Sequence, residues 1–163
     1  MENFLQGRCA SLTHLNLQRN FIGDDGVECL AKVLAECKSL SRLDLGENDI
    51  AVDGAQWLAK VVPQCPSLSY LDLGENYDIG DQGAEYLAEA LRFASLTSLI
   101  LTHDDIGDPG AGRLATVLQG RDGVRHCTAL VHLDLGSNCI SSEVRASITS
   151  SLKRNKSSAQ ASL

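Results

Sequence analysis

Six cysteines and four histidines are the side chains in this sequence best suited to metal binding or nucleophilic chemistry. Their spacing does not form a metal-binding motif, because no Cys-x-x-Cys pair is present and the histidines do not cluster along the chain. The histidines are His14, His103, His126 and His132. Four cysteines form a column three residues before a recurring leucine, at Cys9, Cys37, Cys65 and Cys127. We interpret this column as small, half-buried side chains and predict no metal site.

The motifs of common enzyme classes are missing from the sequence. It contains no Gly-x-Ser-x-Gly, no phosphate-binding Gly-Lys-Ser and no His-Glu-x-x-His. The recurring glycines are better explained by turns and helix starts, and carboxylate pairs such as Asp104-Asp105 by turn and cap chemistry. We therefore predict no catalytic residue and no cofactor, and a protein that is not an enzyme.

A repeated string, Leu-x-x-Leu-x-Leu-x-x-Asn, organises the sequence. Its first leucine falls at Leu12, Leu40, Leu68, Leu96 and Leu130, so that successive copies are 28, 28, 28 and 34 residues apart. Asp104 takes the place of the asparagine in the fourth copy. The alternation of leucine with other residues predicts a short strand in each copy, with its leucines pointing inward.

An amphipathic helix is predicted after each of the first four strands. Apolar residues follow a glycine at helical spacing, as at Val27, Leu30, Ala31 and Leu34 in the first copy. An aspartate stands where the N-cap of the helix is expected, at Asp24 or Asp25, Asp53, Asp81 and Asp108.

The predicted fold class is an α/β solenoid, because one strand and one helix cannot bury a core alone and the copies must stack. Strands lie about 4.8 Å apart and packed helices about 8 to 10 Å. The stack should therefore curve into a right-handed horseshoe with parallel strands on the concave side and helices on the convex side. The recurring asparagines are expected to bond the backbone of the turns between neighbouring copies.

The pattern resembles the ribonuclease-inhibitor type of leucine-rich repeat, which is also found in cytosolic NOD-like receptors and in the activator of the Ran GTPase. The resemblance covers residues 12 to about 152 and implies a protein that binds other proteins through the concave face and adjoining loops. The sequence departs from the pattern at Asp104, in the enlarged turn of Tyr77 and Asp78, and in the last copy, which lacks the Gly-Ala helix start.

We expect one leucine-rich repeat domain over residues 1–152, with a partial repeat at 1–11 and full repeats starting at 12, 40, 68, 96 and 130. Residues 153–163 are predicted to be a frayed polar tail. The longer last step places six additional residues near 119–126, as a surface loop or a lengthened helix end.

The charge distribution favours a protein partner over nucleic acid. Residues 1–120 carry 8 Lys and Arg against 18 Asp and Glu, whereas residues 121–163 carry 6 against 3. Duplex binders need basic side chains to replace counterions, so an acidic body fits a partner with a basic surface.

A cytoplasmic location without membrane association is expected. No apolar run approaches the roughly 18 to 20 residues that cross a bilayer, and the first eight residues lack the features of a signal peptide. An intracellular setting disfavours disulfides within the cysteine column.

The strand side chains that alternate with the leucines are the candidate binding surface. We predict that a partner is bound by Arg42, Asp44, Glu47, Tyr70, Asp72, Glu75, Ile100, His103 and Asp134. Tyr70 and Ile100 would supply apolar contacts and the carboxylates an attractive field. The alternative for the carboxylates is a solvated face that only keeps the protein soluble.

Two other functions remain open. A GTPase-activating protein of the Ran-activator kind would need an exposed catalytic arginine at the strand side and usually has an acidic tail. Here the tail is basic, Arg19 is at the rim, and Arg121 and Arg125 lie on a helix-to-strand return. The other alternative is a structural repeat fragment of a larger receptor.

Overall fold

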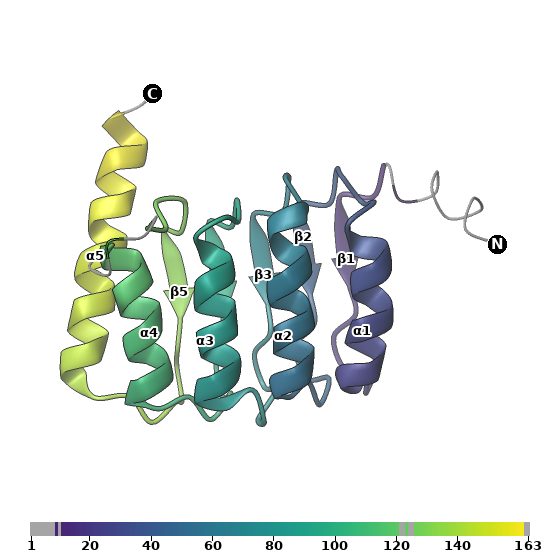
Figure 1. The fold of residues 1–163 in the computed structure, drawn as a ribbon, viewed down its shortest axis with the longest axis horizontal. Coiled ribbons are helices and arrows are strands. Elements are labelled where there is room, and N and C mark those ends of the chain that lie inside the picture. The colour runs from purple at the N-terminus through teal and green to yellow at the C-terminus, as the bar shows by residue number, and fades with distance from the viewer. Residues whose placement is uncertain (1–8, 10, 121–122, 124–125, 162–163) are drawn as a thin grey trace.

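The computed structural model of the chain describes residue 9 and residues 11–120, 123 and 126–161. Short strands and helices alternate along the chain (Figure 1). The strands are β1 (His14–Asn16), β2 (Arg42–Asp44), β3 (Tyr70–Asp72), β4 (Ser98–Ile100) and β5 (His132–Asp134). The helices are α1 (Gly23–Leu34), α2 (Val52–Val61), the 3₁₀ helix η2 (Val62–Gln64), α3 (Gly80–Leu91), α4 (Asp108–Gln119) and α5 (Ser142–Ala161).

The strands form one parallel sheet in the order β1-β2-β3-β4-β5, and the helices lie side by side over one of its faces (Figure 1). The central leucines are in register across the sheet, as Leu15 with Leu43 and Leu43 with Leu71. The predicted α/β solenoid is thus confirmed, and the constant register explains why the leucine string repeats at matching positions.

Inward-pointing leucines and alanines fill the core between sheet and helices. Leu43, Leu71 and Leu99 are fully buried, as are Ala55 and Ala84 on the facing helices. Burial of a leucine side chain contributes roughly 1.5 to 3 kcal/mol, so the column stabilises the stack copy by copy. Leu12, Leu15 and Leu17 of the first copy are only half-buried, since no described repeat packs against that end.

The glycine at each helix start is required by close packing. A Cβ on Gly54 would lie 2.6 Å from Ile50 Cγ2, and one on Gly83 would lie 2.7 Å from Ile79 Cγ2. In these two copies the isoleucine that follows the turn therefore packs directly against the backbone of its own helix.

A ladder of asparagines joins the repeats, as predicted. Asn48 Nδ2 donates to Leu17 O at 2.9 Å and to Leu45 O at 3.0 Å. In turn, Asn76 Oδ1 accepts the Asn48 N–H at 3.0 Å. Both side chains are fully buried, so these bonds satisfy turn groups that water cannot reach.

The prediction that each aspartate caps the N-terminus of its own helix is wrong. None of α1 to α4 has a side-chain cap from its own aspartate; the cap position of α1 is Ile22 and that of α4 is Gly107. The aspartates reach the next repeat instead. Asp24 Oδ1 accepts the Ala51 N–H at 2.8 Å, and Asp81 Oδ1 accepts the N–H of Gly107 at 2.8 Å. Asp24, Asp81 and Asp108 thus accept a backbone N–H just before the helix of the following copy.

The polar tail is helical rather than frayed through Ala161. Helix α5 runs for 20 residues and projects past the other helices (Figure 1). It is anchored by Asn155, which is buried and whose Nδ2 donates to Cys127 O at 3.0 Å and to Leu130 O at 2.8 Å. After Asn155, the described side chains of the helix are exposed.

The insertion near 119–126 lies partly outside the described residues. Helix α4 ends at Gln119, and Gly120 adopts a left-handed conformation with φ 64°, a common helix stop. Among the two forms expected for the insertion, a lengthened α4 is therefore excluded, since the helix has the same 12 residues as α1 and α3.

Candidate functional site

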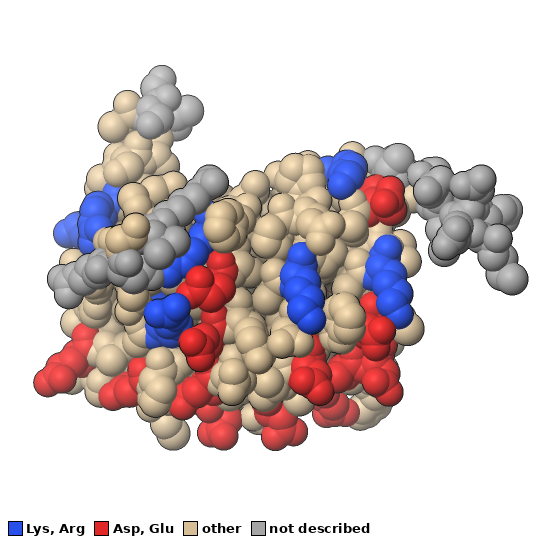
Figure 2. All heavy atoms as spheres, viewed as in Figure 1, with Lys and Arg blue, Asp and Glu red and all other residues tan. Residues whose placement is uncertain are grey.

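The surface made by the outward side chains of β1 to β5 is called the strand face here. The turns that connect each strand to the next helix, residues 17–22, 45–51, 73–79, 101–107 and 135–141, form the loop edge. Figure 2 shows Asp and Glu gathered along the lower edge of the molecule, where the strands end and the helices begin. Lys and Arg lie mainly higher on the helical side in this view.

Three of the predicted residues form one cluster on the strand face. The Arg42 guanidinium lies over the Tyr70 ring, 3.7 Å from its centroid, and Tyr70 Oη donates to Asp72 Oδ2 at 2.9 Å. The register pairs Arg42 with Tyr70 on adjacent strands, which is why they meet. Burial, followed by the hydrogen bond to Asp72, raises the pKa of Tyr70. One face of this ring is thus already covered.

The aspartates of the strand face have a structural task that the sequence analysis missed. Asp44 Oδ1 accepts the Gly46 N–H at 3.2 Å, and the same bond is made by Asp72 to Gly74 and by Asp134 to Gly136. A side chain that accepts the N–H two residues ahead forms an Asx turn, which here ends the strand. Asp44 is only 9% exposed, whereas Asp72 and Asp134 are half-buried.

The other predicted carboxylates belong to the loop edge. Arg19 Nε donates to both carboxylate oxygens of Glu47, at 2.7 Å to Oε1 and 2.8 Å to Oε2. Gln18 Nε2 also donates to Glu47 Oε1, at 2.9 Å. The bond from Arg19 lowers the pKa of Glu47. Glu75 is half-buried and accepts a hydrogen bond from Tyr77 Oη at 3.4 Å.

His103 lies on the loop edge with Glu47 and Glu75, whereas Ile100 lies half-buried on β4 beside Asp72. His103, Glu47 and Glu75 all have positive φ, at 58°, 55° and 62°. The predicted residues therefore divide into two adjacent groups. The strand-face group is Arg42, Asp44, Tyr70, Asp72, Ile100 and Asp134, and the loop-edge group is Glu47, Glu75 and His103.

Two exposed aromatic side chains on the loop edge were missed from the sequence. Phe21 is 84% exposed and Tyr77 is 59% exposed. Both follow a ladder asparagine, at a position that Asp49 and Asp105 fill in other copies. An aromatic residue in a column that is otherwise polar and exposed is the signal that could have identified them.

These rings border a hollow on the loop edge. It has a volume of about 310 Å³ and is lined by Arg19, Phe21, Glu47, Asp49, Glu75 and Tyr77. The hollow spans the turns of the first three repeats. It thus combines apolar rings with carboxylates on a surface next to the strand face.

Comparison of the sequence with protein families identifies the repeats. The profile described as "Leucine Rich repeat" matches residues 8–31, 36–59, 64–88, 94–115 and 126–143. The chain belongs to the leucine-rich repeat family. Comparison with curated proteins gives no match.

Solved leucine-rich repeat structures share the whole fold of the chain. A structure titled "Leiomodin-1 Actin-Binding Site 2 (ABS2)" superposes with a TM-score of 0.83 and 17% identity, over 97% of this chain and 88% of that one. The C-terminal domain of tropomodulin from Caenorhabditis elegans superposes with a TM-score of 0.76 and 17% identity, over 97% of this chain and 92% of that one. At this identity the likeness establishes the fold alone.

The arginine expected for a GTPase-activating protein is already paired in this leucine-rich repeat domain. Arg19, the rim candidate, is engaged with Glu47, and Arg121 and Arg125 lie outside the described residues. The pairing of Arg19 therefore does not support that alternative.

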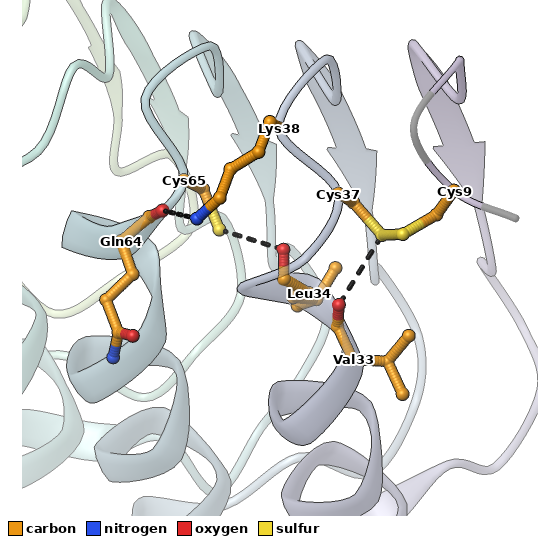
Figure 3. The surroundings of a disulfide bond; sticks show 7 residues. All are labelled: Cys9, Val33, Leu34, Cys37, Lys38, Gln64 and Cys65. Carbon is orange, nitrogen blue, oxygen red and sulfur yellow. Dashed lines mark hydrogen bonds between the residues drawn. A yellow bond between two sulfur atoms is a disulfide. The ribbon is translucent and has the colours of Figure 1, made fainter. Parts of the chain in front are cut away.

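The cysteine column contains a disulfide between Cys9 and Cys37 (Figure 3). The expectation that this column lacks disulfides is therefore wrong. Stacking of the repeats in register brings the two Cα atoms to 4.9 Å, which lies in the range that a disulfide requires. Cys65, the next cysteine of the column, is a buried free thiol, and burial raises its pKa.

One buried acid interrupts the asparagine ladder. Asp104 is fully buried; its Oδ1 accepts the Asn76 N–H at 2.8 Å, while its Oδ2 has no hydrogen-bond partner. Burial raises the pKa of Asp104 to about 8. Asparagine at this place in the other copies donates to backbone carbonyl oxygens, which only the protonated acid can imitate.

Among the residues that the structure describes, no three His, Cys, Asp or Glu side chains are grouped as a metal site. The described helices also include none with the length and apolar character needed to span a membrane.

Proposed function

We propose that this leucine-rich repeat domain is a protein-interaction module that binds a partner with a basic surface through the strand face and the loop edge. The observation that carries the proposal is the hollow in which Phe21 and Tyr77 stand exposed among carboxylates. Exposed aromatic residues in an otherwise polar surface mark binding sites, since rings supply most of the desolvated contact at interfaces.

The strand face supports the same proposal. Tyr70 and Ile100 are half-buried but still accessible, and Asp134 keeps a carboxylate oxygen beyond the one used in its turn. Asp72 accepts from Gly74 and from Tyr70 and still adds its charge to this face. Clustered carboxylates raise the local concentration of an oppositely charged partner and speed its association. The structurally similar leiomodin-1 segment is described as an actin-binding site, which agrees with a role in protein binding for this fold.

The finer parts of the proposal follow from the sequence. We infer a repeat of the ribonuclease-inhibitor type from the 28-residue step, and a cytoplasmic role that involves binding rather than catalysis. Nucleic acid and membrane surfaces fit poorly to the acidic body, because both attract basic proteins.

Affinity capture with matched variants tests the proposal. The variant Asp72→Asn/Asp134→Asn removes two charges from the strand face and keeps the turn acceptors, since Asn16 makes the same turn in the first copy. The control Glu28→Gln/Glu36→Gln removes two charges from the helical side, where both residues lie in or just after α1.

For each protein that the parent captures from lysate at low salt, the strand-face variant should capture at least fivefold less. The control should capture the same amount as the parent. Equal capture by the parent and both variants would contradict docking on this surface. Circular dichroism of all three proteins checks that the fold is intact.

A further inference from the structure

The hollow on the loop edge has two aromatic walls with a carboxylate between them. Phe21, Asp49 and Tyr77 each directly follow the ladder asparagine in the first, second and third repeats. Neighbouring parallel strands are about 4.8 Å apart, so positions two repeats apart are separated by about 10 Å. Because Phe21 and Tyr77 both line the hollow, a flat cation that enters it lies within reach of both rings.

The free charge in the hollow is negative. Glu47 is engaged by Arg19, which leaves Asp49 and Glu75. Within the part of the chain that the structure describes, Asp49 makes no side-chain hydrogen bond or ion pair, and it is exposed. The charge of Glu75 is the largest cause that raises the pKa of Tyr77. A cation between the rings would therefore be attracted by both carboxylates.

The chain already shows how such a cation is held. On the strand face, the Arg42 guanidinium stacks on the Tyr70 ring at 3.7 Å beside Asp72. A guanidinium is planar, stays charged, and donates in a fork that matches a carboxylate, whereas a lysine ammonium is a compact, strongly hydrated charge.

We propose that the hollow receives an arginine side chain from a basic segment of the partner, held in contact with Phe21 and Tyr77 and paired with Asp49. This inference rests on the proposed function, because it assigns part of the same docking surface to one residue of the partner. It places the recognition of arginine on the loop edge rather than on the strand face.

Fluorescence anisotropy with defined peptides tests the inference. The probe is a labelled peptide with three arginines spaced by Gly-Ser, compared with the same peptide carrying lysine or citrulline. Citrulline keeps the shape of arginine and removes its charge. The parent should bind the arginine peptide most tightly, the lysine peptide several-fold more weakly, and the citrulline peptide most weakly of the three.

Matched variants locate the binding. Phe21→Ser/Tyr77→Ser should weaken arginine-peptide binding about tenfold, since each exposed ring contact contributes a few-fold. The control Phe93→Ser changes another exposed aromatic residue, 58% exposed, away from the hollow. Asp49→Asn should weaken binding, while Asp105→Asn, which changes the same position one repeat beyond Tyr77, should leave it unchanged.

Two results would overturn the inference. If Phe21→Ser/Tyr77→Ser bound the peptide like the parent while Asp72→Asn/Asp134→Asn weakened it, arginine would be bound on the strand face and the proposed function would stand. If the citrulline peptide bound as tightly as the arginine peptide, the hollow would not recognise a cation.

Discussion

Asp104 is the residue whose chemistry differs most from its place in the repeat. Its four counterparts are asparagines that satisfy turn groups in the ladder. With a pKa of about 8 in the folded protein, the acid stays protonated at neutral pH, whereas the unfolded chain releases this proton near pH 4. Between these values the folded state binds the additional proton, so the contribution of Asp104 to stability falls as pH rises and levels off above about pH 8.

Asp104→Asn should supply an amide donor that does not depend on pH and so remove this pH dependence. We expect the free energy of unfolding to rise by roughly 1 to 3 kcal/mol at pH 8, with a smaller gain at pH 5, because the replacement satisfies a buried group without a charge. Urea denaturation at the two pH values measures the effect. A gain that is the same at both pH values would contradict the assignment of the titrating group.

The role of a residue could be predicted from the sequence only where it depends on contacts within a single repeat. The buried leucines and the ladder asparagines follow from spacing within a copy, and both are confirmed. The aspartates at the helix starts were assigned to their own helices, but Asp81 caps the next one. That contact depends on how far neighbouring repeats are offset, which spacing within one copy does not specify.

At the scale of elements, the disulfide joins the segment before β1 to the return after α1. The intracellular setting expected from the sequence disfavours this bond. The observed link shows that register decides which cysteines meet, because matching positions of neighbouring repeats lie about one strand spacing apart. Disulfides persist in oxidising compartments, so the cytoplasmic location stays a prediction that the thiol state can test.

The disulfide predicts a thiol count and a loss of stability on reduction. The denatured, unreduced protein should expose four reactive thiols, from Cys29, Cys65, Cys127 and Cys139. Reduction should lower the free energy of unfolding by about 3.5 kcal/mol, because the bond spans 28 residues and restricts the unfolded chain. Thiol titration and urea denaturation with and without reductant measure both quantities. Six thiols in the unreduced, denatured protein would contradict the pairing.

Helix α5 shows where element prediction from composition fails. Residues 153–161 are polar and carry no apolar period, so the sequence indicated a frayed tail. The helix is nevertheless tied to the stack by the buried amide of Asn155, which bonds two carbonyl oxygens of the return before β5. The first half of α5 packs on the core through Val144, Ile148 and Leu152. Beyond Leu152 the described helix is held by one polar anchor, which leaves no hydrophobic pattern to detect.

For the whole molecule, a single leucine period specifies both the strand register and the stacking, which is why the fold could be predicted from the sequence. The binding surface could be predicted in part. The alternation of residues places Arg42, Tyr70 and Asp72 on one face, and the structure brings them together. Burial of Asp44 could not be foreseen, since it depends on contacts across repeats.

Hydrogen–deuterium exchange of the domain, alone and with a protein captured in the affinity experiment, tests the binding surface most directly. The account predicts slower exchange in the turns 17–22, 45–51 and 73–79 and in strands β2 and β3, with no change on helices α1 to α4. Protection confined to the helices, with unchanged exchange in these turns and strands, would contradict docking on the strand face and the loop edge.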